Sequence, residues 1–206
     1  TVALGGLTIG VTNLELTGAY AAIANQGVYQ EPIFYTKIYD HEGNLLIDKT
    51  ADRESHQVIS KENAWLLTSA MKDVVTAGTG GAVNFRGMTI AGKTGTTSND
   101  KDVWFVGYTP YYTAGVWAGY DIPTSKLRTI AEKNYHKKLW KSVMSRIHEE
   151  LPSKDFEQPE DIIRVAVCSE SGKLPVPGLC DLDPRGCIVE EYFAKGFEPV
   201  ESCDVH

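Results

Sequence analysis

The chain has 206 residues with a net charge of −7, and 42 % of its residues are hydrophobic. A chain of this length can bury roughly 70 % of its unfolded surface in one or two globular domains. The acidic balance gives no electrostatic support to a nucleic-acid partner, so we expect none. No apolar run approaches the roughly 18 residues that a membrane-spanning helix needs. Because the sequence begins at Thr1 without a methionine, we expect it to be a piece of a longer protein.

Two helices are predicted in the first half of the chain. Residues 11–26 place small and apolar side chains on a broad helical stripe, and Thr12 or Asn13 can cap its start. Residues 60–77 follow the same period, with Ser60 as the N-cap and a glycine-rich loop after the last turn.

Strands are predicted in two places. Residues 33–48 alternate apolar and polar side chains around a polar turn at 41–44, which indicates a hairpin. Further strands are expected over residues 88–97, 102–109 and 112–120, and the short connections between them favour an antiparallel meander. The fold class is therefore mixed α/β of the α+β type, with an antiparallel sheet flanked by helices.

A third helix is expected before Pro152, with its apolar side chains on one buried face. That face carries Leu139, Trp140, Val143, Met144, Ile147 and Leu151. Polar residues follow, and then a stretch rich in Cys, Pro and Gly. We therefore divide the chain into a main domain over 1–155 and a linker with a small cysteine-containing module over 156–206.

The histidines stand outside every motif in the sequence. We expect them to be solvated or only lightly packed, with no part in the chemistry. They are His41, His56, His136, His148 and His206.

The segment with the clearest chemical potential is Lys-Thr-Gly-Thr at the end of an apolar run. On a strand, Lys93 and Gly95 share one face, and Thr94 and Thr96 share the other. Gly95 has no Cβ, so a second backbone can approach closely there. Such an edge suits a peptide carboxylate, and a free backbone N–H can stabilise an oxyanion. Four residues alone, however, also occur at ordinary strand ends.

The wider sequence resembles the class A penicillin-binding proteins, which are bifunctional cell-wall synthases, over their transpeptidase domain. The resemblance covers about residues 4–155, and it rests on segments that follow one another in the family's order. They are GVTNLELTGAYAAIANQGVYQEPIF, KIYDHEGNLL, VVTAGTGGAV, AGKTGTT, DVWFVGYTPYYTAGVWAGYD and LWKSVMSRIHEELP.

This resemblance implies the penicillin-binding and serine β-lactamase-like transpeptidase fold, present here in part. Its members are serine acyltransferases that attack the D-Ala-D-Ala bond of a peptidoglycan stem peptide and pass the acyl group to an amine. β-Lactams mimic that dipeptide and acylate the same serine. The reaction needs no cofactor.

Carried onto this chain, the resemblance assigns roles to one segment. Lys93 matches the lysine that orients proton transfer and attracts the substrate carboxylate, and the backbone N–H of Thr96 matches half of the oxyanion hole. These two are the expected catalytic residues. Thr94, Gly95, Thr96 and Thr97 are the expected substrate-binding residues.

The family's other two motifs, S-x-x-K and S-x-N, are not found where they are needed. Ser69 and Lys72 have the first spacing but lie on the family's non-catalytic helix, and Ser98 and Lys101 follow the third motif. No S-x-N occurs in the sequence. We therefore expect the chain to be inactive alone, because the nucleophile and its base act as a unit.

The resemblance also implies partners and a location. The expected partners are the D-Ala-D-Ala stem peptide, β-lactams in the complete domain, and the missing N-terminal part of the same protein. The expected location is the extracellular face of the bacterial cytoplasmic membrane, with the anchor and a glycosyltransferase domain outside this chain. A β-lactam-sensing module without transpeptidation is the alternative, and residues 164–206 can be a non-catalytic interaction module.

All four cysteines, Cys168, Cys180, Cys187 and Cys203, lie in the C-terminal module. In an exported protein, four cysteines in a small module indicate two disulfides, so all four are disulfide candidates. Free buried thiols are one alternative. Zinc is a weaker one, with Cys203 and His206 as a close pair, because structural zinc sites favour shorter paired spacings. The sequence therefore assigns no metal ligand.

Overall fold

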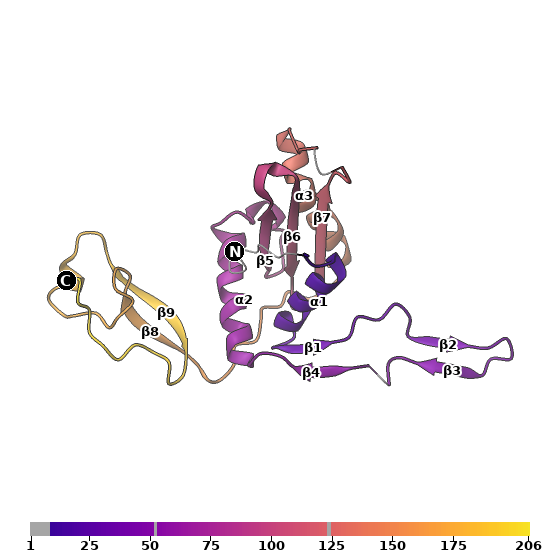
Figure 1. Ribbon diagram of the computed structural model, residues 1–206. Helices are drawn as coiled ribbons and strands as arrows, with labels where there is room; N and C mark the ends of the chain where they lie inside the picture. The colour runs from indigo at the N-terminus through magenta and orange to yellow at the C-terminus, as the bar shows by residue number, and fades with distance from the viewer. Residues whose placement is uncertain (1–8, 52, 123–124) are drawn as a thin grey trace. The chain divides into compact units, whose positions relative to one another are not determined.

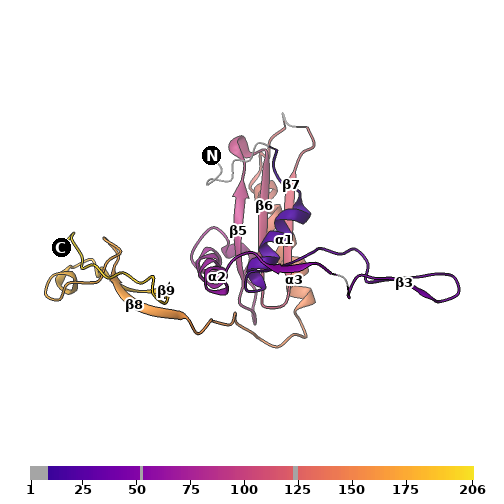
Figure 2. The same cartoon turned by 60° about the horizontal axis from the view of Figure 1, so that its bottom comes forward.

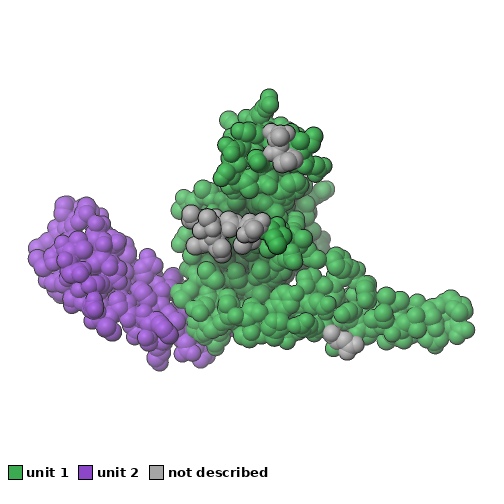
Figure 3. Space-filling view, viewed as in Figure 1, with its two compact units in different colours: residues 1–156 green, residues 157–206 purple. Residues whose placement is uncertain are grey.

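The computed structural model describes residues 9–51, 53–122 and 125–206. The chain divides into two compact units, Thr1–Phe156 and Glu157–His206, which Figure 3 shows in different colours. Each unit has a hydrophobic cluster of its own. We therefore describe each unit by itself.

The centre of the first unit is a three-stranded antiparallel sheet in the order β5-β6-β7 (Figure 1). The strands are β5 (Ala91–Thr96), β6 (Asp102–Tyr108) and β7 (Thr113–Gly119). Helices flank this sheet, so the predicted fold class and meander are confirmed.

Three helices are described: α1 (Asn13–Ala24), α2 (Lys61–Thr76) and α3 (Ile130–Ile147). Thr12 caps α1 in a capping box, and the Ser60 side chain accepts from the backbone at the start of α2. Both predicted caps are confirmed. Within the described ranges, no helix is long and apolar enough to cross a membrane.

The helices α1 and α3 pack on opposite faces of the sheet (Figure 2). On one face, Gly115 of β7 lies so close to α1 that an added Cβ would come within 2.2 Å of the Thr17 hydroxyl. On the other face, the Phe105 ring meets Trp140 of α3 edge-on, with ring centroids 5.1 Å apart. Because Phe105 opposes Val116, the residue after Gly115, these contacts fall on opposite faces.

Two shorter strand pairs complete the first unit. β1 (Val28–Gln30) pairs with β4 (Ser55–Gln57), and β2 (Lys37–Tyr39) pairs with β3 (Leu45–Asp48), all antiparallel. The turn between β2 and β3 is held by the Asp40 carboxylate, which accepts from two backbone N–H groups at 2.8 and 2.9 Å. The predicted hairpin is thus confirmed.

The second unit is built on β8 (Ile162–Cys168) and β9 (Ile188–Ala194), which pair antiparallel along their whole length. A short 3₁₀ helix, η4 (Cys180–Leu182), lies between them in sequence. The last segment of the chain pairs with the segment after β8 through a parallel bridge between Leu174 and Ser202. The core of this unit is therefore assembled from segments well separated in sequence.

The core of the first unit depends on one aromatic side chain. Phe105 is fully buried, and its ring lies over two glycines, Gly92 of β5 and Gly107 of β6, which oppose each other in the sheet. An added Cβ would come within 2.6 Å of this ring at either glycine. The glycines therefore make the space in which Phe105 packs against α3. The buried cluster comprises Val75, Val83, Ile90, Phe105, Trp140 and Met144.

The buried face of α3 differs from the predicted one. Of the six apolar residues expected there, Trp140 and Met144 are buried, whereas Leu139, Val143 and Ile147 are 39 to 49 % exposed. The buried row continues instead through two histidines spaced four residues apart from them, His136 and His148. Those two are not solvated as expected. His148 is hydrogen-bonded to the Thr109 hydroxyl and to the Met144 carbonyl, so its burial is compensated.

Replacement of Gly107 by alanine is predicted to destabilise the first unit by about 1–3 kcal/mol, because the new methyl overlaps the Phe105 ring. Gly18→Ala in α1 is the matched control. Its Cβ meets only ordinary contacts at 3.5 Å or more, so its effect should be neutral, or stabilising by up to about 1 kcal/mol. Denaturant unfolding midpoints measure both effects, and equal effects would contradict the packing argument.

The pH dependence of stability is predicted to contain a contribution from His136. Burial, aided by the neighbouring Lys137 ammonium, lowers the pKa of His136 from 6.5 to about 4. As the pH falls, the unfolded chain binds a proton at His136 at a higher pH than the folded chain does. Stability is therefore lost as the pH falls from about 6.5 towards 4. When the pH is lowered from 7 to 5, the free energy of unfolding should fall by about 2 kcal/mol less in His136→Met than in the parent chain. Denaturant unfolding at the two pH values measures this difference. His41→Gln, at an exposed site, should keep the parental slope.

Candidate functional site

The end of β5 has a backbone donor on the edge that pairs with no strand among the described residues. Within the described ranges, β6 is the only strand paired with β5. The N–H of Thr97 donates to the Asp102 carbonyl at 3.2 Å, on the β6 side. Because N–H directions alternate along an antiparallel strand, those of Thr94 and Thr96 point away from β6. Thr96 therefore offers its N–H at the open edge.

The side chains of the motif are divided between the two faces of the sheet. Thr94 opposes the buried Phe105 and lies on the α3 face, whereas Lys93 opposes Val106 and lies on the α1 face. Lys93 and Thr96 are exposed, which leaves both accessible to a ligand. The Lys93 ammonium donates to the Thr94 carbonyl at 3.0 Å, so the lysine bends along its own strand.

A hydroxyl pair joins β5 to the loop after α2. The Oγ1 atoms of Thr79 and Thr94 lie 2.8 Å apart and share a hydrogen bond. Lys137 of α3 reaches the Thr79 carbonyl at 3.5 Å. The loop then continues into the 3₁₀ helix η2 (Gly81–Val83). Thr79 was not predicted as a site residue, because its glycine-rich surroundings indicate only a flexible loop.

The loop between β5 and β6 follows directly after the motif. Thr97 uses its hydroxyl to accept from the Asp102 N–H at 3.1 Å, so it holds the start of β6. The 3₁₀ helix η3 (Ser98–Asp100) follows, with positive φ at Asn99 and Asp100. Lys133 of α3 pairs with the Asp100 carboxylate at 2.6 Å. Helix α3 thus contacts the loops on both sides of the motif.

The S-x-x-K pattern formed by Ser69 and Lys72 lies on α2. Lys72 on α2 pairs with the Asp155 carboxylate at 3.1 and 3.3 Å, and Ser69 is half-buried one turn earlier. The neighbouring Thr68 is buried and shares a hydrogen bond of 2.7 Å with the Tyr108 hydroxyl, whose pKa is raised by burial. Lys72 is therefore engaged in an ion pair that holds the end of the first unit.

A cleft of about 510 Å³ lies away from the motif. It is formed near the turn between β6 and β7, at the end of the sheet where β5 begins rather than ends. Its lining includes Ala24, Val28, Arg53, Thr109 and Tyr111. The cleft is therefore separate from the Lys93–Thr97 segment.

The disulfide candidates come together in the second unit. Cys168, Cys180, Cys187 and Cys203 are all buried, and all four are free thiols in this structure. His206, which the sequence offers only as part of the weaker zinc alternative, lies among them.

Comparison with known proteins places this geometry in a family. Residues 1–148 match the family described as "Penicillin binding protein transpeptidase domain", and residues 158–206 match "Penicillin-binding protein 1A, C-terminal domain". The fold and the Lys-Thr-Gly-Thr strand thus define the class, and the chain belongs to the penicillin-binding protein transpeptidase family.

The similar proteins carry related names. Penicillin-binding protein 1A of Clostridium perfringens is 35 % identical over 96 % of this chain and 23 % of its own length. The structure of Penicillin-Binding Protein 1A from Haemophilus influenzae has a TM-score of 0.75, with 24 % identity over 94 % of this chain and 33 % of that one. PonA1 from Mycobacterium tuberculosis has a TM-score of 0.63, with 30 % identity over 70 % of this chain and 40 % of that one. The chain spans about a quarter of the length of its curated relatives.

Proposed function

We propose that this chain forms one wall of the acyl-transfer site of a serine D,D-transpeptidase that cross-links peptidoglycan stem peptides. The observation that carries the proposal is the Thr96 N–H at the open edge of β5. An extended peptide ending in a carboxylate can add to this edge as a further strand. The same N–H then donates to the carbonyl that becomes an oxyanion during attack.

Each motif residue has a distinct role in this proposal. The Lys93 ammonium attracts the substrate carboxylate and supports proton transfer at the nucleophile. The hydroxyls of Thr94 and Thr96 bind the carboxylate, and Gly95 leaves room for the substrate backbone. Thr94 is oriented by its hydrogen bond to Thr79. Thr97, whose hydroxyl accepts from the Asp102 N–H, shapes the loop beside the substrate rather than standing free.

The nucleophilic serine, its lysine and the S-x-N motif are proposed to come from another segment of the same protein. An anchor that holds the domain at the outer face of the cytoplasmic membrane, and a glycosyltransferase domain, are likewise proposed to lie outside this chain. The short share of the relatives' length that this chain covers supports that division. PonA1 has been solved "in complex with penicillin V", which supports β-lactams as ligands of the complete site.

The alternative is a β-lactam-sensing module that is acylated but does not cross-link. The two functions are distinguished in the complete protein with a fluorescent penicillin and with lipid-linked peptidoglycan. Labelling together with cross-linked product supports the transpeptidase, and labelling without product supports the sensor.

In the complete protein, Lys93→Met is predicted to lower the rate constant for β-lactam acylation by at least about 100-fold, because it removes the charge that supports proton transfer. Thr96→Val should lower it by about 10-fold through the loss of a hydrogen bond to a charged group. Stopped-flow measurement of acylation tests both variants. Lys141→Met, at an exposed position on α3, is the matched control and should change the rate less than about twofold. Equal effects of the two lysine variants would contradict the assigned role of Lys93.

Incubation of the 206-residue chain alone with a fluorescent penicillin is predicted to give no covalent adduct, because Ser69 has no activated base partner: Lys72 is paired with Asp155. Intact-mass spectrometry provides the measurement. In the complete protein, Ser69→Ala should be labelled at the parental rate. An adduct mapped to Ser69 would overturn this interpretation.

A further inference from the structure

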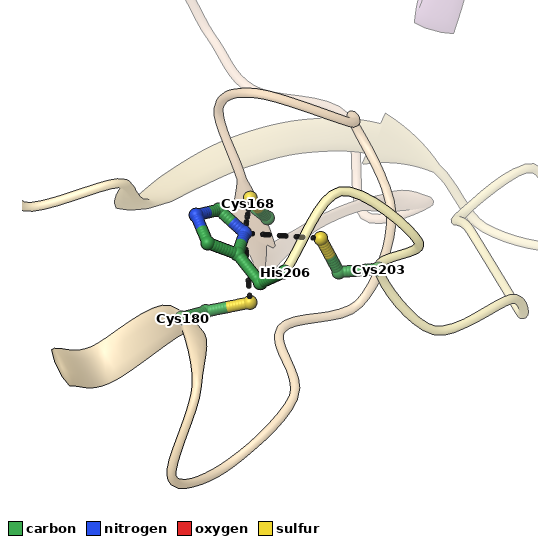
Figure 4. A group of neighbouring side chains, drawn as sticks. All are labelled: Cys168, Cys180, Cys203 and His206. Atoms are coloured by element: carbon green, nitrogen blue, oxygen red, sulfur yellow. Dashed lines mark hydrogen bonds between the residues drawn. The ribbon is translucent and has the colours of Figure 1, made fainter. Parts of the chain in front are cut away.

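Three thiols surround one ring nitrogen of His206 in the second unit. The Sγ atoms of Cys203, Cys168 and Cys180 lie 3.3, 3.5 and 3.6 Å from His206 Nδ1. Figure 4 shows the three sulfurs converging on this nitrogen from different segments of the chain. All four ligand-type atoms lie within 4.8 Å of one another.

Hydrogen bonding alone does not account for this arrangement. A ring nitrogen of histidine has either one lone pair or one hydrogen, so Nδ1 can make one good hydrogen bond and not three. The Nε2 atom lies 2.7 Å from the Asp183 carboxylate, and in the tautomer that donates from Nε2 to this carboxylate, Nδ1 carries the lone pair of the ring. A lone pair aimed among three sulfurs is the arrangement that a metal cation satisfies.

The distances fit a tetrahedral zinc centre. Zinc bonds of about 2.3 Å to sulfur and 2.0–2.1 Å to nitrogen, at tetrahedral angles, separate each sulfur from the nitrogen by about 3.5–3.6 Å. The three observed separations, 3.3 to 3.6 Å, bracket this value. Three sulfurs and one imidazole nitrogen also match the Cys₃His ligand set of closed, structural zinc sites.

The surroundings of the cluster hold its ligands in place. Asp183 orients the His206 ring, and Arg185 in turn pairs with Asp183 at 2.6 Å. A carboxylate on the far nitrogen of a metal-bound histidine is a recurrent outer-shell contact. The backbone N–H of Val176 donates to the Cys180 sulfur at 3.2 Å, which stabilises a thiolate. The ligands are thus fixed from outside the cluster as well as by one another.

The fourth cysteine lies on a different side of the imidazole. Cys187 Sγ is 3.7 Å from Nε2 rather than from Nδ1, and it donates to the Cys180 carbonyl at 3.1 Å. It is therefore a buried thiol with a partner of its own. This position makes it the natural control for the three cysteines around Nδ1.

We propose that Cys168, Cys180, Cys203 and His206 bind one zinc ion as a structural site. The ion would join the end of β8, the start of η4 and the last residues of the chain. The buried cluster of this unit consists of the four cysteines with Val176 packed against it, so a cross-link takes the place of an apolar core. The two disulfides favoured by the sequence spacing account for four sulfurs, but they give no role to the His206–Asp183 pair.

The first experiment measures metal and thiols in the full 206-residue chain, purified without chelator and also after export to an oxidising compartment. We expect about one zinc per chain by inductively coupled plasma mass spectrometry. After denaturation with a chelator and without reductant, four thiols should react with iodoacetamide. A chain that binds no zinc when offered excess Zn²⁺, or whose thiols are consumed as two disulfides, would overturn the proposal.

The second experiment compares variants by competition for zinc with a chromophoric chelator. Cys203→Ser and His206→Ala should weaken zinc binding at least 100-fold, and Asp183→Asn about 10- to 100-fold. Cys187→Ser, the matched replacement of a buried cysteine, should retain parental affinity within about threefold. Circular dichroism at saturating zinc checks that each variant is folded. Loss of zinc in Cys187→Ser equal to that in Cys203→Ser would show that the ligand set is wrong.

Co²⁺ substitution gives a readout that does not depend on stability. The parent chain and Cys187→Ser should show the intense visible bands of tetrahedral cobalt together with thiolate-to-metal charge transfer. His206→Ala should lose or shift these bands. Weak bands typical of octahedral oxygen coordination in the parent chain would contradict a Cys₃His site.

Discussion

The packing of Phe105 across two opposed glycines is the contact on which the first unit depends. Because Gly92 and Gly107 carry no Cβ, the ring reaches over both strands and meets Trp140 of α3. The ring lies across both members of the pair, so it favours the observed register of β5 against β6 over a shifted one. The register decides which N–H groups of β5 point outward, and one of these belongs to Thr96. The proposed oxyanion donor at the edge of β5 is thus positioned by a hydrophobic contact on the face of the sheet that packs against α3.

The sequence predicts those parts of the structure that depend on local pattern. The caps at Thr12 and Ser60, the three strands and the hairpin all follow from residue type and spacing, and all are confirmed. The contribution of Thr79 could not be predicted, because its partner Thr94 becomes a neighbour only when the loop after α2 folds back. The buried histidines of α3 were missed for another reason: polarity argues for exposure, whereas position in a four-residue row decides burial.

In the second unit, sequence spacing and spatial arrangement lead to different expectations. Along the chain, Cys168 and Cys180 are too far apart to suggest a metal-binding pair, so disulfides are the natural interpretation. In space, the pairing of β8 with β9 and the bridge from Leu174 to Ser202 bring the chain end against both cysteines. The histidine among the sulfurs has no counterpart in a disulfide framework, and a pattern of cysteines alone does not reveal it.

Helix α3 connects the core with the loops around Lys-Thr-Gly-Thr through two parallel rows of side chains. One row, Lys133 and Lys137, holds the loops on either side of β5, and the other, His136 through His148, fills the core. Each residue advances a helix by roughly 100°. A single inserted or deleted residue between positions 133 and 136 would therefore turn Lys133 away from Asp100 while Lys137 and the buried row stayed in place. The interior of this helix should therefore tolerate a change of residue type more readily than a change of length, because only the latter alters which side chains face the core and the loops.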